Sequence, residues 1–162
     1  MAEPLRVAII GAGIGAQHLE AYRLCRERFE VAAICDLNLP RAMALAGGRI
    51  PVSDDYRSLC SDPAIDIIDV CLPPLMHTPA ILGALQFGKH VICEKPLVAC
   101  LAELDRIEEA EALAGGARIF PVFQYRFGPA GRALKALREK GCLGAPLAAA
   151  LETHWNRAAD YY

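Results

Sequence analysis

The sequence predicts an α/β protein in which a doubly wound, mostly parallel sheet carries helices on both faces. The main observation is an alternation: from residue 5 to about residue 123, short runs rich in β-branched residues alternate with amphipathic stretches of helix length. Such alternation is typical of parallel strands joined by crossover helices. A glycine-rich turn follows the first run, and boundary signals such as Pro73-Pro74 and Gly115-Gly116 stand where elements are expected to end.

The first unit is the clearest, with a strand over residues 5–10, a glycine turn and then a helix. In that helix, residues 14, 18, 21, 22, 25 and 29 are expected to share one face at helical periodicity. The other strands are predicted near 30–35, 49–52, 66–72, 90–93 and 118–123. The other helices are predicted near 40–46, 55–61, 77–87, 100–114 and 129–140. Asp69 interrupts one predicted strand; because a buried carboxylate without partners is costly, we expect it at a strand end, near a helix N-terminus or water.

The composition bounds the class of protein. The chain has 162 residues, of which 54% are hydrophobic and 22% charged, and its net charge is −2. These values exclude a disordered chain and leave no general attraction to nucleic-acid phosphates. No apolar run approaches the roughly 20 residues of a membrane span, and no secretory signal is read at the start. We therefore expect a soluble, cytoplasmic protein that binds neither nucleic acid nor membrane.

The seven cysteines show no Cys-x-x-Cys spacing, so the sequence predicts free thiols and no metal site. Cys35, Cys71 and Cys93 stand near the ends of apolar runs, where cysteine packs as a small hydrophobic residue. A catalytic or metal-binding cysteine is the less favoured alternative.

The pattern changes after residue 140. Residues 1–123 are predicted to form one domain and residues 124–146 an interdomain helix and loop. Residues 147–162 then begin with an apolar, extended-looking stretch, Leu147–Trp155. That stretch is similar to the opening strand of another sheet, and a lone apolar strand templates association through its free edge. We therefore expect residues 147–162 to begin a truncated second domain of the α+β class.

The glycine turn carries the first functional prediction. Gly11-Ala-Gly13-Ile14-Gly15-Ala16 lies between a strand and a helix, as a dinucleotide-binding turn requires. Gly11 permits the tight turn, Gly13 lets the backbone approach a diphosphate, and Ala16 is expected in the third position, against the strand. The helix N-terminus would present N–H groups to the phosphates.

Asp36 ends the second predicted strand, where an acidic side chain can accept hydrogen bonds from both ribose hydroxyls of an adenosine. Its carboxylate would repel a 2′-phosphate, which favours NAD over NADP. The nearby Arg41 keeps NADP open. The alternative is that Asp36 is the N-cap of the helix beginning near Pro40.

Glu94-Lys95-Pro96 directly follows the strand 90–93. Ligands of open parallel sheets lie beyond the carboxyl ends of the strands, so Lys95 can orient a substrate hydroxyl there or lower its pKa. A surface ion pair between Glu94 and Lys95 is the alternative.

Taken together, these motifs resemble the glucose-fructose oxidoreductase, inositol dehydrogenase and rhizopine catabolism (Gfo/Idh/MocA) family, along nearly the whole chain. The segments that carry the resemblance are Gly11–His18, Ser53–Tyr56, Asp66–His77 and Gly88–Pro96. The last is the most specific, because few other dinucleotide-binding folds follow a Gly-Lys-His-Val strand with Glu-Lys-Pro.

The resemblance implies a Rossmann-type fold and a role for several residues. Lys95 would be catalytic, in contact with substrate or the nicotinamide ribose. The other residues expected to bind the cofactor are Gly11, Gly13, Ile14, Gly15, Asp36, Leu72, Pro73, His77, Glu94 and Arg126. Trp155 and Arg157 are implied near the nicotinamide, although Trp155 can equally be core of the missing sheet. The alternative for Arg126 is a structural ion pair, and His18 is either a helix-face histidine with satisfied hydrogen bonds or a residue that lines the cleft.

The sequence departs from the family in length, since relatives are longer and supply their acid-base Asp and His from a second domain. The function expected for the intact parent is NAD(P)-dependent oxidation of a sugar, cyclitol or other polyol, in a homo-oligomer. This chain by itself is expected to bind NAD(H) weakly and to be inactive. Two alternatives stay open: a non-enzymatic NAD-sensing module, and an interaction protein that self-associates through Leu147–Trp155.

Overall fold

The computed structural model describes residues 3–150, 152, 154, 156 and 158. The chain forms two compact units, Met1–Phe123 and Gln124–Tyr162, and each is described by itself. Trp155 and Arg157, implied by the family resemblance, lie outside the described residues. No helix among the described residues is long and apolar enough to cross a membrane.

The first unit is built on a six-stranded sheet in the order β3-β2-β1-β4-β5-β6, and every neighbouring pair is parallel. This order is that of a Rossmann sheet, in which the strand order reverses between β1 and β4. The predicted fold class is therefore confirmed. The strands are β1 (Leu5–Ile10), β2 (Phe29–Cys35), β3 (Val52–Ser53), β4 (Ile67–Val70), β5 (His90–Cys93) and β6 (Ile119–Pro121).

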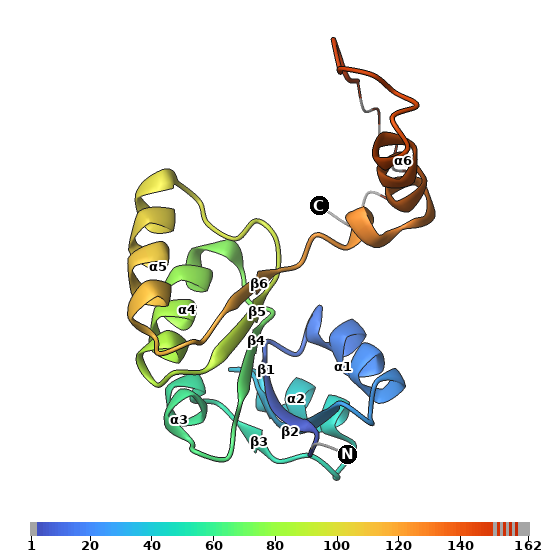
Figure 1. Ribbon diagram of the computed structural model, residues 1–162. Coiled ribbons are helices and arrows are strands. Elements are labelled where there is room, and N and C mark those ends of the chain that lie inside the picture. Colours follow the sequence, from blue (N-terminus) through green and yellow to red (C-terminus); the bar gives the residue numbers. More distant parts are fainter. Residues whose placement is uncertain (1–2, 151, 153, 155, 157, 159–162) are drawn as a thin grey trace. The chain divides into compact units, whose positions relative to one another are not determined.

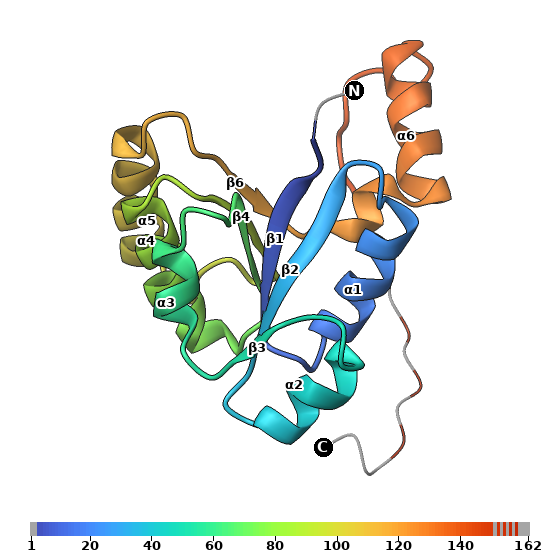
Figure 2. The same ribbon diagram turned by 90° about the horizontal axis from the view of Figure 1, so that it is seen from below.

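Helices cover both faces of the sheet (Figures 1 and 2). One face carries α1 (Gly15–Leu24) and α2 (Leu39–Ala46), and the other carries α3 (Tyr56–Ser61), α4 (His77–Gln86) and α5 (Leu101–Leu113). A short 3₁₀ turn, η1 (Pro74–Met76), leads into α4. Crossover helices place apolar side chains on both sides of a parallel sheet, which explains why the strands read as nearly continuous apolar runs.

Two cores result, one on each side of the sheet. Ile9, Leu19 and Ile34 are buried beneath α1 and α2, while Ile68 and Ile81 belong to the core beneath α3, α4 and α5. Each fully buried isoleucine or leucine contributes about 1.5 to 3 kcal/mol relative to an exposed one. These cores fix the carboxyl ends of β1, β2 and β4 side by side.

Helix α1 differs from its prediction in both length and face. It ends at Leu24 rather than near residue 29, and its buried residues are Gly15, Leu19 and Tyr22. Phe29 belongs instead to β2, after a turn closed by hydrogen bonds from Arg28 and Phe29 to the carbonyl oxygen of Cys25. The prediction was wrong because it placed Ile14 on the buried face of the helix. The close approach of Gly15 to β1 instead decides which face is buried.

The second unit holds a 3₁₀ turn, η2 (Gln124–Phe127), and helix α6 (Pro129–Glu139). The helix agrees with its prediction. Residues 147–150, where a strand was expected to begin, form no strand, and Leu147 is fully exposed. A strand is stabilised by its pairing neighbour, and none of the described residues pairs with these four.

Candidate nucleotide-binding site

A pocket of about 680 Å³ opens at the carboxyl ends of β1, β2 and β4. This place is where open α/β sheets bind ligands, beside the point at which the strand order reverses. The volume lies within the usual range for ligand sites, roughly 300 to 1,000 Å³. Its lining residues are Ile10, Gly11, Gly13, Cys35, Asp36, Leu37, Arg41, Asp54, Asp55, Tyr56, Arg57, Cys71, Leu72, Pro73 and Met76.

Gly11 is required by the turn that leaves β1. Its φ is +105°, and a Cβ atom built there would stand 2.3 Å from the carbonyl oxygen of Cys71. Its N–H donates to the carbonyl oxygen of Cys35 at 2.8 Å. Glycine thus permits both the left-handed backbone and the close passage between β2 and β4.

The roles of the next residues differ in part from the prediction. Gly13 lines the pocket, and a Cβ there would meet nothing within 4 Å, so its missing side chain leaves space for a ligand. The tight approach of helix to strand occurs at Gly15, where a Cβ would lie 2.7 Å from Ile9 Cγ2, and Ala16 is only half-buried. Gly15, not Ala16, therefore takes the helix-packing position.

The N-terminus of α1 is poised to receive an anion. Its N-cap, Ile14, makes no side-chain hydrogen bond to the helix. The first N–H groups of a helix lack intrahelical partners and carry the positive end of the helix dipole. With Gly13 open toward the pocket, the amides of Gly13, Ile14 and Gly15 can hold a phosphate. The N–H groups of Ala16 and Gln17 donate to the Gly13 and Ile14 carbonyl oxygens instead.

Asp36 is buried against this turn and its carboxylate is saturated with donors. The Ala12 N–H donates to it at 2.7 Å, the Asn38 N–H at 2.8 Å, and the Arg41 guanidinium at 2.8 to 3.1 Å. Burial raises the pKa of Asp36, but these hydrogen bonds and the charge of Arg41 outweigh burial and hold the pKa below its ordinary value. Asn38 is the N-cap of α2, accepting from the Arg41 N–H, so the alternative that Asp36 caps this helix is wrong.

The segment after β4 forms one wall of the pocket. Leu72 and Pro73 line it, as does Met76. His77 is fully buried behind them, with Nδ1 2.9 Å from the Pro96 carbonyl oxygen and Nε2 2.8 Å from the Leu72 carbonyl oxygen. His77 thus connects the wall to the segment after β5, and its role in binding a cofactor stays a prediction.

Glu94 and Lys95 lie beyond the end of β5, the strand next to β4. Glu94 is buried and its carboxylate accepts from the Lys95 N–H at 3.1 Å, while the Lys95 side chain is exposed. Among the described residues, the side chains of Glu94 and Lys95 do not form the surface ion pair considered as the alternative. Glu94 Oε1 instead lies 3.2 Å from His18 Nε2.

That contact belongs to a buried polar cluster that was not predicted from the sequence. His18 Nδ1 lies 2.9 Å from an Asp69 carboxylate oxygen, and the Tyr22 hydroxyl donates to the same oxygen at 3.0 Å. Cys71 Sγ completes the cluster, 3.5 Å from His18 Nδ1. Asp69 is therefore satisfied by side chains of α1 and not by a helix N-terminus or water, which corrects the expectation. The missed signal was the two-residue spacing between Asp69 of β4 and Cys71, which directly follows that strand.

The cluster shifts the ionisation of its members. Burial lowers the pKa of His18, but its hydrogen bonds and charge attraction with Asp69 and Glu94 outweigh burial and raise the pKa above 6.5. Burial, followed by the charge of Asp69, raises the pKa of both Tyr22 and Cys71 far above the ordinary values. His18 thus agrees with the first of its two interpretations, a helix-face histidine with satisfied hydrogen bonds. Its partners, Asp69 and Glu94, are both buried.

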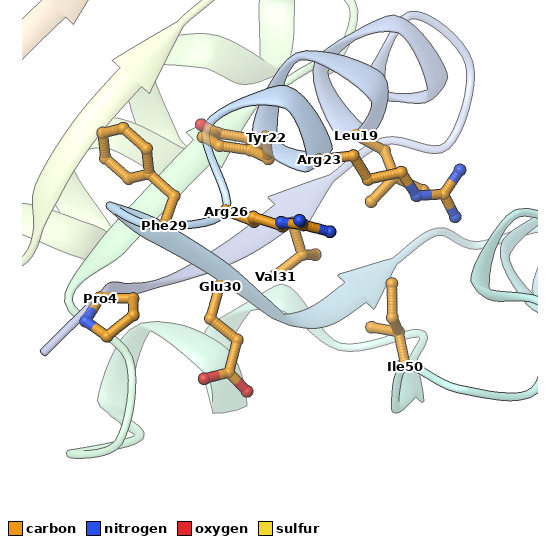
Figure 3. Close-up of a pocket in the computed structure, with 9 residues that line it drawn as sticks. All are labelled: Pro4, Leu19, Tyr22, Arg23, Arg26, Phe29, Glu30, Val31 and Ile50. Carbon is orange, nitrogen blue, oxygen red and sulfur yellow. The ribbon is translucent and has the colours of Figure 1, made fainter.

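A second pocket, of about 300 Å³, lies at the opposite end of α1 (Figure 3). It is formed by apolar side chains such as Leu19, Phe29 and Ile50 together with Arg23 and Arg26. Because it adjoins the amino end of β2, it is remote from the strand ends where the predicted residues gather.

Arg126 lies in η2 of the second unit and is exposed, and none of the described residues forms an ion pair with it. The structural ion pair considered for Arg126 is therefore not found in the described part of the chain. Its placement near a cofactor stays a prediction.

Comparison with known proteins agrees with this geometry. Residues 5–119 match the family described as "Oxidoreductase family, NAD-binding Rossmann fold". The chain is 36% identical over 157 residues to an inositol 2-dehydrogenase of Acidothermus cellulolyticus, covering 95% of this chain and 46% of that protein. It is 44% identical over 96 residues to a D-glucoside 3-dehydrogenase of Escherichia coli, covering 57% of this chain and 27% of that protein.

Among solved structures, the myo-inositol dehydrogenase from Lactobacillus casei in complex with NAD(H) and myo-inositol superposes with a TM-score of 0.80 at 32% identity, covering 89% of this chain and 44% of that one. The chain thus spans less than half the length of these relatives. The match over residues 5–119, together with the sheet order and the glycine turn, shows that the chain belongs to the Gfo/Idh/MocA oxidoreductase family, with its NAD-binding Rossmann fold.

Proposed function

We propose that this chain forms the NAD(H)-binding part of a dehydrogenase that oxidises a hydroxyl-bearing carbon of a sugar, cyclitol or related polyol. The observation that carries the proposal is that the open amide turn at Gly13 and the carboxylate of Asp36 line one pocket. A diphosphate at the turn would bring the adjoining ribose toward Asp36. The relatives named as inositol and glucoside dehydrogenases support the substrate class.

The residues present fit this cofactor. The amides of Gly13, Ile14 and Gly15 would hold the diphosphate, since those of Gly11 and Ala12 donate to Cys35 and Asp36. Asp36 would hold the ribose hydroxyls, and Leu72 with Pro73 would wall the nicotinamide half. When bound, NAD supplies the hydride acceptor, and the protein's part is to orient and shield it. Lys95, exposed beyond β5, would orient the substrate hydroxyl.

Ribose binding requires Arg41 to move. A carboxylate offers about four acceptor positions, and all are engaged by Ala12, Asn38 and Arg41. The Arg41 side chain is 54% exposed, so its displacement into water costs little. Since Asp36 remains buried and negative, NADH should bind better than NADPH.

We further propose that residues 1–162 bind NADH without turning over a polyol. The relatives are more than twice as long as the matched region, and the resemblance assigns acid-base catalysis to a domain that follows it. The test is fluorescence titration of this chain with NADH, together with an assay of NAD reduction in the presence of myo-inositol or glucose. Saturable binding and no NADH formation are expected; absent binding contradicts the first part, and measurable oxidation contradicts the second.

A matched pair of variants locates the site. Gly13→Ala places a methyl group in the open space where the diphosphate is expected, so it should weaken NADH binding about tenfold or more, equivalent to at least roughly 1.4 kcal/mol. Gly83→Ala, in α4, is the control, because its Cβ would make only an ordinary contact with Cys60 Sγ of α3, 3.9 Å away. Unchanged affinity in Gly13→Ala would place the nucleotide elsewhere.

A further inference from the structure

The polar cluster behind the nucleotide pocket contains three different metal-ligating atoms in close approach. His18 Nδ1, Asp69 Oδ1 and Cys71 Sγ form a triangle with sides of 3.1, 3.5 and 3.7 Å. They come from α1 and from the end of β4. Asp69 is fully buried, Cys71 is nearly so, and the His18 side chain is 15% exposed. This site could not be predicted from the sequence, because His18 is far from Asp69 and Cys71 in the chain and the three lack a recognised metal-ligand spacing.

The triangle has the dimensions of one face of a zinc coordination sphere. Bond lengths of about 2.0 to 2.3 Å at tetrahedral angles separate neighbouring ligand atoms by roughly 3.3 to 3.6 Å. An ion set slightly out of the plane of the three atoms could therefore reach all of them with shifts of a few tenths of an ångström. Imidazole, carboxylate and thiolate together are a donor set that suits zinc.

The surroundings provide the outer partners that zinc sites use. His18 Nε2, the nitrogen that faces away from the triangle, lies 3.2 Å from Glu94 Oε1. A carboxylate on the second nitrogen of a ligating histidine fixes its tautomer and orientation. The Tyr22 hydroxyl donates to Asp69 Oδ2, the oxygen left over by the triangle.

Charge also favours a cation at this point. Asp69 and Glu94 place two carboxylates in the interior, and among the described residues His18 is the one basic side chain that contacts them. Burying carboxylates without compensation is costly. Cys71 also lines the large pocket, so the cluster adjoins it.

We propose that His18, Asp69 and Cys71 bind one zinc ion, which ties α1 to the end of β4 behind the glycine turn. Binding displaces the proton from His18 Nδ1 and the proton of the Cys71 thiol, both of which pass to solvent. The ion's two positive charges then balance the thiolate and the Asp69 carboxylate. Three protein ligands leave one coordination position for water, and the role proposed for the ion is to hold α1 against the end of β4.

The experiment uses the 162-residue chain with Cys25, Cys100 and Cys142 changed to Ser, because these three exposed thiols would bind metal adventitiously. Cobalt(II) is titrated into this variant as a spectroscopic probe of zinc. One equivalent should produce a thiolate-to-cobalt charge-transfer band and the intense visible bands of tetrahedral cobalt. Zinc should then bleach both stoichiometrically.

Additional substitutions in the same background assign the ligands. Cys71→Ser should abolish the charge-transfer band, and His18→Gln should abolish tight binding. Glu94→Gln should weaken zinc binding by roughly 10- to 100-fold, while Cys60→Ser, a buried thiol outside the cluster, should leave binding unchanged. Circular dichroism of each metal-free variant separates loss of a ligand from loss of the fold.

A second measurement does not depend on the variants. Zinc bound only by the folded chain must raise its unfolding midpoint in proportion to the logarithm of free zinc. The proposal is overturned if wild-type cluster residues give no thiolate band, if the band survives Cys71→Ser in a folded protein, or if zinc leaves the unfolding midpoint unchanged. No nucleotide is needed in these assays, so their outcome is independent of the proposed function.

Discussion

Asp36 shows how one side chain serves both the fold and the pocket. In the described structure it joins the glycine turn, the start of α2 and Arg41 through its two oxygens. Its position at the end of β2 could be predicted from the sequence, because a ribose-binding acidic residue is expected directly after the second strand. The competing N-cap interpretation failed since Asn38, two residues later, is better placed for α2.

Asp36→Asn is expected to lower the free energy of unfolding by about 1.5 to 3 kcal/mol at neutral pH, the usual range for hydrogen bonds to a charged group. The folded state holds the pKa of Asp36 below the ordinary value of about 3.9. Its stabilising contribution is therefore present above that value and is lost as the pH falls through the lower folded value. Urea unfolding from pH 7 to pH 3 should show the difference between wild type and variant shrinking only below about pH 4.

The control for this comparison is Glu108→Gln, which removes an exposed carboxylate from α5. It should have little effect at any pH, within about 0.5 kcal/mol. A gap between wild type and Asp36→Asn that stays constant down to the lowest pH would show that the charge of Asp36 is not what stabilises the fold.

Gly11→Ala tests whether the turn after β1 can accommodate a Cβ atom at residue 11. The methyl group would collide with the Cys71 carbonyl in a backbone conformation that alanine rarely adopts. We expect a loss of about 2 kcal/mol or more in thermal or urea unfolding, in contrast to Gly13→Ala, which should leave stability nearly unchanged. Equal stability of the two variants would mean that the turn relaxes freely.

At the scale of elements, the contact between α1 and β4 is the most informative. The existence and order of the helices and strands followed from the sequence, because apolar periodicity and glycine or proline boundaries are local signals. The end of α1 and the partners of Asp69 did not, since both depend on which residues meet across the sheet. Gly15 shows the same limit: its close approach to Ile9 decides the helix phase and is invisible in the local pattern.

Tyr22→Phe measures that contact. The substitution removes the hydroxyl that donates to Asp69 while keeping the ring, which packs edge-on against Phe29 at 5.6 Å between centroids. Because Asp69 keeps His18 as a partner, we expect a loss of about 1 to 3 kcal/mol rather than unfolding. Chemical denaturation is the measurement, and Tyr56→Phe, in α3, is the comparison. A loss no larger than that of Tyr56→Phe would show that the hydroxyl contributes little.

At the scale of the whole molecule, the sheet divides the first unit into two cores that protect different cysteines. Cys35, Cys60, Cys71 and Cys93 are buried, and Cys25, Cys100 and Cys142 are exposed. The sequence predicted free thiols and identified three of the four buried ones from their apolar surroundings. Cys60 could not be identified in this way, because its burial depends on α3 packing against α4.

Thiol labelling should therefore divide the cysteines into two classes. Burial is the largest cause that raises the pKa of Cys35 and Cys93 to about 12 and that of Cys60 to about 11, so few of these groups are thiolates at mildly alkaline pH. Ellman's reagent should modify the three exposed thiols rapidly in the native chain and all seven in denaturant. A fourth thiol that reacts as fast as the exposed ones would show that one core opens readily.

The edges of the sheet have a consequence for how the molecule behaves in concentrated solution. The outermost strands are its shortest, two residues in β3 and three in β6. Fibrils grow when strands of other molecules pair with a long, exposed edge strand. Edge strands as short as β3 and β6 offer few unpaired N–H and C=O groups for such pairing. Short edge strands of this kind limit association through the sheet edge even where nothing covers them.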